Sequence, residues 1–241
     1  MDFPFLRDSF LQLLSGMPLT LELTAVAFGI GSVLALIIAM MRAAPLLPLR
    51  AIAQLYVFVL RGTPLLVQIF LIYYGLGQFR PFLQDIGLWS VFREPYWCAI
   101  LALAMNSAAY GSEILRGTLA SVPLREIEAA RACGMSGLLL YRRIVLPIAL
   151  RQAIPAYGNE LILMVKATSL ASIITMMDVT GIAARLISDS YRPVEIFMAA
   201  GVLYLGINFV LSRAVTLLDW WLSPHLRRAA SPRPKMDFPH V

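Results

Sequence analysis

Five long apolar runs constrain the fold of this chain more than any other feature of its sequence. They cover about residues 19–41, 51–75, 96–115, 156–177 and 194–218. A hydrocarbon core about 30 Å thick needs about 20 such residues in helical conformation. The composition agrees, since 59% of the residues are hydrophobic and 14% are charged, whereas soluble domains are about 25% charged. We expect an all-α integral membrane protein with about five transmembrane helices in one domain, residues 1–222.

The second run contains a proline in its first half, in the segment Arg61-Gly62-Thr63-Pro64. Proline lacks a backbone N–H and its ring clashes with the preceding turn of a helix. We therefore expect a kink or a break at this point.

The basic residues indicate the orientation of the chain. With the N-terminus outside, fourteen Lys and Arg residues fall on the cytoplasmic side and five on the outer side, while Lys166 lies within a span. Basic residues favour the cytoplasmic side of a membrane. We expect a cytoplasmic loop over residues 116–155, a cytoplasmic C-terminus, and a flexible basic tail over residues 223–241.

The inventory of side chains argues against catalysis. Lys166 and Lys235 are the only lysines, and neither follows a glycine, so the chain has no phosphate-binding GxxxxGK[ST] loop. The only histidines, His225 and His240, lie in the tail. We expect neither a metal site nor an enzymatic activity.

The sequence of the cytoplasmic loop predicts a pair of short amphipathic helices. Helix-forming residues fill Glu126 to Cys133, Gly134 suits the left-handed residue that ends a helix, and Ser136 suits the start of the next one. Pro147 is expected to stop that second helix. Such a pair either enters a groove of a partner protein or lies on the lipid surface.

Seven positions of this loop carry a resemblance to a known family. They match the EAA pattern of the membrane subunits of ABC importers, and they are Glu128, Ala129, Ala130, Gly134, Ile144, Leu146 and Pro147. The segments 61–68, 110–123 and 149–172 are also similar to the polar amino acid branch of this family. Residues 126–127 and 155–160 look most like the M-type subunit of histidine/lysine/arginine/ornithine and octopine/nopaline importers.

The resemblance implies a type I ABC importer fold and a set of partners. These are a pair of ATPase subunits that bind ATP and Mg, a second, distinct permease subunit, a periplasmic binding protein and an amino acid substrate. The seven motif residues would couple the permease to the ATPase. The chain itself would sit in the bacterial inner membrane, need no cofactor and bind no nucleic acid, and its cargo would be basic amino acids or opine derivatives.

Polar residues within the spans are candidates for a substrate pathway, because ionisable groups in a membrane are costly and mostly face an interior cavity. Two stripes share helix faces: Asn106, Tyr110 and Glu113 on the third run, and Asn159, Lys166 and Ser169 on the fourth, where Glu160 is a further candidate.

Each ionisable candidate also has a structural interpretation. In that interpretation, Glu113 would pair with Arg116 one turn away, Glu160 would anchor the cytoplasmic loop, and Lys166 would pair with a carboxylate of the second subunit. The same three groups would also suit an ion-coupled secondary transporter, the rival function. Those folds are mostly built from internal repeats, which the single cytoplasmic hairpin does not suggest.

Overall fold

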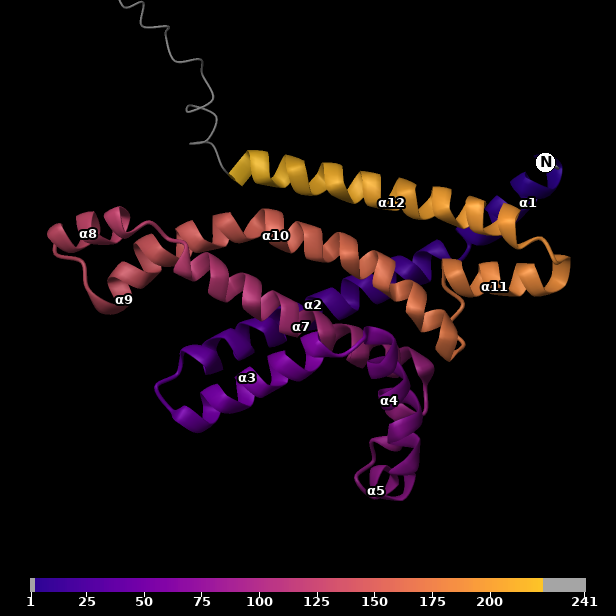
Figure 1. Ribbon diagram of the computed structural model, residues 1–241, viewed down its shortest axis with the longest axis horizontal. Helices are drawn as coiled ribbons and strands as arrows, with labels where there is room; N and C mark the ends of the chain where they lie inside the picture. Colours follow the sequence, from indigo (N-terminus) through magenta and orange to yellow (C-terminus); the bar gives the residue numbers. More distant parts are fainter. Residues whose placement is uncertain (1–2, 223–241) are drawn as a thin grey trace, which may run out of the picture.

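The computed structural model of the protein describes residues 3–222, and the predicted basic tail, 223–241, lies outside them. All the regular elements of the described residues are helices (Figure 1). Its elements are α1 Phe3–Leu14, α2 Met17–Ala43, α3 Leu47–Gly62, α4 Leu65–Gln78, α5 Arg80–Asp85, α6 Trp89–Phe92, α7 Pro95–Ala120, α8 Leu124–Ala132, α9 Gly137–Leu140, the π-helical turn η1 Tyr141–Val145, α10 Leu146–Ala167, the 3-10 helix η2 Thr168–Ile174, α11 Val179–Ser190 and α12 Pro193–Leu222.

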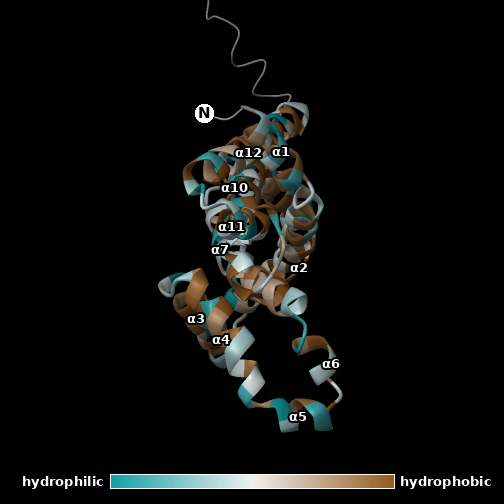
Figure 2. Cartoon of the chain, turned by 90° about the vertical axis from the view of Figure 1, so that its right-hand side faces the viewer, coloured by the Kyte–Doolittle hydropathy of each residue, from teal (hydrophilic) through white to brown (hydrophobic). Residues whose placement is uncertain are grey.

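Several of these helices have the length and hydropathy of membrane spans. Within residues 3–222, three stretches qualify individually: Pro4–Ala43, Pro95–Ala120 and Pro193–Leu222. Two bent helix pairs bring the number to five if each pair forms one span. Many large apolar side chains of these helices are exposed, and hydrophobic residues, brown in Figure 2, run along much of their length. An apolar exterior of this kind suits contact with lipid or with another apolar subunit.

The helices α2 and α7 form the centre of the bundle (Figure 1). Their contact is close because α2 presents small residues four positions apart, Ala27, Gly31 and Ala35. A Cβ atom on Gly31 would lie 3.1 Å from the carbonyl oxygen of Ala104 on α7. Small residues at this spacing are the usual means by which membrane helices approach each other closely. Helix α10 packs against α7, and α12 packs against α10.

The expected break at Pro64 is confirmed. Helices α3 and α4 meet there at an angle of 107°, and α4 leads away from the bundle toward α5 (Figure 1). Thr63 and Pro64 both have extended backbone conformations. Thr63 does not continue α3, because the residue before a proline is pushed out of the helical region.

The expectation that Pro147 stops a helix is wrong. The chain remains helical from Gly137 to Ile174, through Pro147 and Pro155. The π-helical turn Tyr141–Val145 comes directly before Pro147, and the N–H of Leu146 donates to the carbonyl oxygen of Tyr141 five residues earlier. This wider turn relieves the clash that a proline ring makes with the preceding helical turn. Helix α10 therefore begins ten residues before the apolar run predicted at 156–177.

Candidate functional site

A polar cluster lies where the second span is broken, and it begins with Gln68. Pro64 has no N–H to donate to the carbonyl of Leu60, four residues earlier in α3. The side-chain nitrogen of Gln68 supplies this hydrogen bond at 2.8 Å. The same nitrogen also donates to the carbonyl and hydroxyl oxygens of Thr63, at 3.1 and 2.9 Å. Gln68 thus replaces the donor that the break removes.

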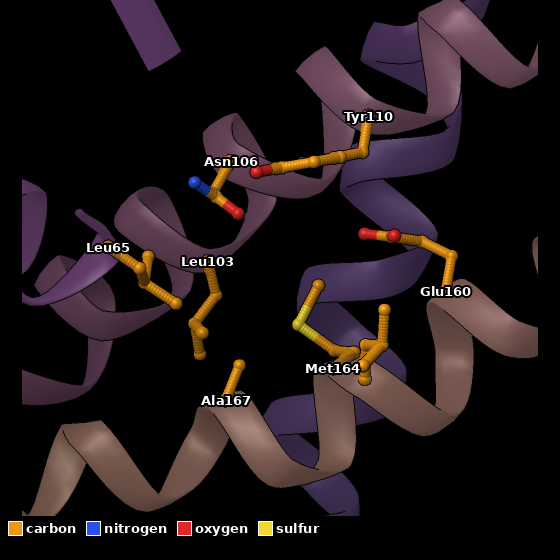
Figure 3. A pocket seen from close by; sticks show the side chains of 8 residues that line it. Leu65, Leu103, Asn106, Tyr110, Glu160, Met164 and Ala167 are labelled. Carbon is orange, nitrogen blue, oxygen red and sulfur yellow. The ribbon is translucent and has the colours of Figure 1, made fainter. Parts of the chain in front are cut away.

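Asn106 of α7 joins this cluster through its amide nitrogen. The nitrogen donates to the side-chain oxygen of Gln68 at 3.0 Å and to the carbonyl oxygen of Leu60 at 3.4 Å. Because both of these partners accept hydrogen bonds, the Asn106 side chain must turn its own oxygen away from them. Figure 3 shows that this oxygen points into a neighbouring cavity.

This cavity, which we call the acceptor cavity, lies between α4, α7 and α10 and has a volume of about 220 Å³. Its polar atoms come from Asn106, Tyr110 and Glu160, whose side chains converge in Figure 3. Glu160 is 8% exposed, and Ser107 is a hydrogen-bond partner of its carboxylate. The rest of the wall is apolar, formed by Leu65, Leu103, Leu163, Met164 and Ala167.

The acceptor cavity offers a carboxylate, an amide oxygen and a hydroxyl group within an apolar wall. The first two accept hydrogen bonds without donating, and the hydroxyl can do either. An apolar site with a few convergent polar groups is the usual form of a small-molecule pocket. This polarity suits an ammonium or guanidinium group better than an anion.

A second cavity, which we call the arginine cavity, lies between α2, α3 and α7 and has a volume of about 520 Å³. Its charged groups are Arg42, Arg61 and Glu113. Arg42 donates to one carboxylate oxygen of Glu113 at 2.5 Å, and Arg116 donates to the other at 2.8 Å. The contact with Arg116 matches the structural interpretation expected for Glu113, although Arg42 was not foreseen. Tyr110 lines both cavities and forms a wall between them.

The structure brings the candidate pathway residues together only in part. Asn106, Tyr110 and Glu160 share the acceptor cavity, and Glu113 lies in the arginine cavity. Asn159 instead lines a groove toward α12. A rotation of about 100° per residue separates the directions of neighbouring side chains on a helix, so the Glu160 face of α10 meets α7 and the Asn159 face does not.

The other two members of the predicted stripe also lie outside the acceptor cavity. Lys166 is exposed on the surface of the described chain, and the hydroxyl of Ser169 donates to its carbonyl oxygen at 2.6 Å. Gln68, by contrast, was missed by sequence reasoning. Its position four residues after Pro64 is the signal that marks it as a replacement donor.

The EAA residues run from the hairpin of α8 and α9, at one end of the bundle, through η1 to the start of α10 (Figure 1). Gly134 has a φ of +80°, as expected for the turn. Ser136 lies at the start of α9, but its side chain makes no capping hydrogen bond. Ala130 is buried in a small apolar core that Ile144 joins, whereas Glu128 and Ala129 are exposed. Leu146 is exposed and Pro147 half-buried where α10 begins.

The structure combines long apolar helices, a polar cavity between them and an exposed helical hairpin at one end. These features define the class of the protein, which is that of membrane transport permeases. The sequence matches the family described as "Binding-protein-dependent transport system inner membrane component" over residues 31–223. The chain belongs to this family, and it is therefore an inner membrane permease component. This membership does not favour the ion-coupled secondary transporter.

The chain is similar to curated relatives over most or all of its length. It is 54% identical over 241 residues, 100% of both chains, to the nopaline transport system permease protein NocM of Agrobacterium fabrum. It is 42% identical over 197 residues to the histidine/lysine/arginine/ornithine transport system permease protein HisM of Escherichia coli K12, covering 82% of this chain and 83% of the relative.

Solved structures share the fold. A crystal structure of an amino acid ABC transporter with histidines has a TM-score of 0.82 and 34% identity, covering 91% of this chain and 98% of the other. An inward-facing MetNI methionine ABC transporter has a TM-score of 0.70 at 20% identity, covering 88% and 96% of the two chains. The protein thus has the type I ABC importer permease fold.

Proposed function

We propose that the chain is the permease subunit of an ATP-driven importer for basic amino acids or for opines that contain one. The observation that carries this substrate class is the acceptor cavity, in which the carboxylate of Glu160 and the side-chain oxygen of Asn106 face the same space. The names of the relatives support the same class, because they refer to nopaline and to histidine, lysine, arginine and ornithine.

The proposed orientation places the N-terminus outside the cell and the hairpin and the tail, 223–241, in the cytoplasm. In this arrangement each bent helix pair counts as one span, which gives five spans in a single domain, 1–222. The excess of basic residues on the hairpin side supports it.

The hairpin is the proposed contact with a pair of ATPase subunits, which would bind ATP and Mg and perform the hydrolysis, leaving this chain without a catalytic role. Exposed Glu128 and Ala129 would enter a groove of the ATPase, while Ala130 and Ile144 hold the hairpin together from inside. Leu138 of the hairpin is 81% exposed, and a groove of the ATPase would cover this apolar side chain.

The continuous helix from Gly137 to Ala167 gives this contact a mechanical connection to the cavity. Through η1, Leu146 and Pro147 it joins the hairpin to α10, which carries Glu160. Movement of the hairpin on ATP binding would therefore shift one wall of the acceptor cavity. Such a shift would bias the permease between its outward-open and inward-open states.

The remaining proposed partners are a second, distinct permease subunit and a periplasmic binding protein. Asn159 and Lys166 of α10 and Ser169 of η2 are proposed to serve the assembly, with Lys166 pairing to a carboxylate of the second subunit. Lys166→Met should then weaken the association of the two permeases and leave the affinity for substrate unchanged.

Binding of arginine by variants of the acceptor cavity tests the substrate class. Glu160→Gln keeps the shape of the side chain and removes its charge, and a hydrogen bond to a charged group contributes about 1.5–3 kcal/mol. We expect an affinity for L-arginine about 10- to 100-fold lower in the complex purified from native membranes. An unchanged affinity would remove the cavity from the pathway.

Coupling is tested at Gly134, where a Cβ atom would meet no neighbour within 4 Å but the φ of +80° disfavours any other residue. Gly134→Val should reduce uptake into proteoliposomes and uncouple it from ATP hydrolysis, while the protein still reaches the membrane. Gly117→Ala is the matched control, because Gly117 also has open space but lies in the regular helix α7. Normal uptake by Gly134→Val would contradict the coupling role.

A further inference from the structure

The charges of the arginine cavity are not balanced within the described residues. Three guanidinium groups, those of Arg42, Arg61 and Arg116, surround the single carboxylate of Glu113. Arg42 and Arg116 occupy its two oxygens, whereas the nearest nitrogen of Arg61 is 3.8 Å away. That distance exceeds hydrogen-bond length, so Arg61 retains donors for another acceptor.

Arg61 lies at the wall of the cavity, beside Tyr110. Its guanidinium carbon lies 5.1 Å from the ring centroid of Tyr110, an arrangement typical of a cation–π contact. Its side chain is 43% exposed. The Nε atom of Arg42 is also buried without a hydrogen-bond partner. The cavity therefore has guanidinium donors in excess of acceptors, and it suits an anion with several oxygen atoms.

The sizes of the two cavities indicate where that anion comes from. The acceptor cavity, at about 220 Å³, is smaller than the about 300–1,000 Å³ usual for small-molecule sites. It can enclose one end of an amino acid or opine, and the other end must lie elsewhere. Among the lining residues described, Tyr110 is the one that the acceptor cavity and the arginine cavity share.

We propose that the arginine cavity is an anion subsite in which Arg61, supported by Arg42, binds a carboxylate of the transported solute while the solute's cationic group occupies the acceptor cavity. The inference rests on the proposed function, since it assigns the second half of the same substrate. The two cavities together then recognise opposite charges at the two ends of one molecule, on either side of Tyr110.

This assignment is tested by measuring the equilibrium binding of small molecules to the complex. The binding protein is left out, because it binds substrates by itself. The complex is purified from native membranes in mild detergent, and three probes are compared: L-arginine, octopine, and agmatine, which has the guanidinium and carbon chain of arginine without the carboxylate. We expect the wild type to prefer L-arginine and octopine to agmatine by about 10-fold, the lower end for charged hydrogen bonds because Arg61 is half-exposed.

Arg61→Gln should abolish this preference and leave the affinity for agmatine unchanged, and Arg61→Lys should restore part of it. Retained agmatine binding shows that the variant is folded. Arg93→Gln is the matched control, because Arg93 is an exposed arginine paired with Glu94 outside both cavities. It should change neither affinity.

The outcomes separate this inference from the proposed function. If Glu160→Gln weakens all three probes but Arg61→Gln keeps the preference for the carboxylates, the anion subsite is refuted and the substrate class stands. Failure of the wild type to bind any probe would overturn both. If free acetate strengthens the binding of L-arginine as much as that of agmatine, and Arg61→Gln loses both effects, the site serves a separate anion and not the solute's own carboxylate.

Discussion

The replacement of the proline's missing donor by Gln68 gives a quantitative prediction. Gln68→Met keeps an unbranched side chain of similar size and removes all the hydrogen bonds of the amide. The carbonyl of Leu60 then loses its 2.8 Å donor, and no backbone N–H can replace it, because the residue four positions later is Pro64. Only the longer 3.4 Å contact from Asn106 remains.

The expected cost follows from two contributions. A buried polar group left without its partner costs about 1–3 kcal/mol. The lost contact between Gln68 and Asn106 adds about 0.6 kcal/mol, the average for side-chain hydrogen bonds between membrane helices. Because Asn106 partly compensates at Leu60, we expect the free energy of unfolding to fall by about 2 kcal/mol.

The measurement is reversible unfolding of the purified chain in mixed micelles of mild detergent and dodecyl sulfate, followed by circular dichroism. Gln78→Met is the matched control, because Gln78 is an exposed glutamine at the end of the same helix, α4, and its loss should be within about 0.5 kcal/mol of zero. The reasoning is refuted if the two variants unfold alike. It also fails if Gln68→Met and Asn106→Leu are additive in a double-mutant cycle, since residues in one network should couple.

Three further substitutions probe the scaffold around the cavities. Asp178→Ala should lower the free energy of unfolding by about 2 kcal/mol, because its fully buried carboxylate caps α11; Asp178→Asn should lose about half as much, as measured by the same unfolding assay. Gly158→Ala should reduce the unfolding midpoint by an amount corresponding to about 1–3 kcal/mol, because its Cβ would overlap the side chain of Val215 on α12, whereas Gly206→Ala, where a Cβ meets nothing within 4 Å, should be neutral or slightly stabilising. Glu113→Gln should lower thermal stability through repulsion among the surrounding arginines, and added salt should recover part of the loss in a melting series, since screening weakens such repulsion.

Local chemistry explains why part of this structure was predictable. The break at Pro64 follows from a missing N–H, and the turn at Gly134 from a residue that tolerates positive φ, so both appeared in the sequence. The motif of the hairpin likewise indicated the family. Each of these features depends on a few consecutive residues, and no distant contact is needed to produce it.

The continuation of helix through Pro147 was not predictable in the same way. A proline in a helical sequence favours a stop, and the π-helical turn that accommodates it depends on the packing of the hairpin core around Val145 and Ala149. For a related reason, the sequence did not show which of the candidates on the fourth run, Asn159 or Glu160, faces α7. A helix can turn either Asn159 or Glu160 toward α7, and a shift of one residue in the expected face changes which side chain enters the cavity.

The sequence by itself determined that the chain is a helical membrane protein, where its second span breaks, and which loop carries the EAA motif, because hydropathy and backbone chemistry act locally. Only the tertiary structure decided that Gln68 replaces the proline's donor, that Glu160 faces Asn106, and that three arginines surround Glu113. These arrangements join helices far apart in the chain, and they depend on how the small residues of α2 and α7 let the central helices pack together.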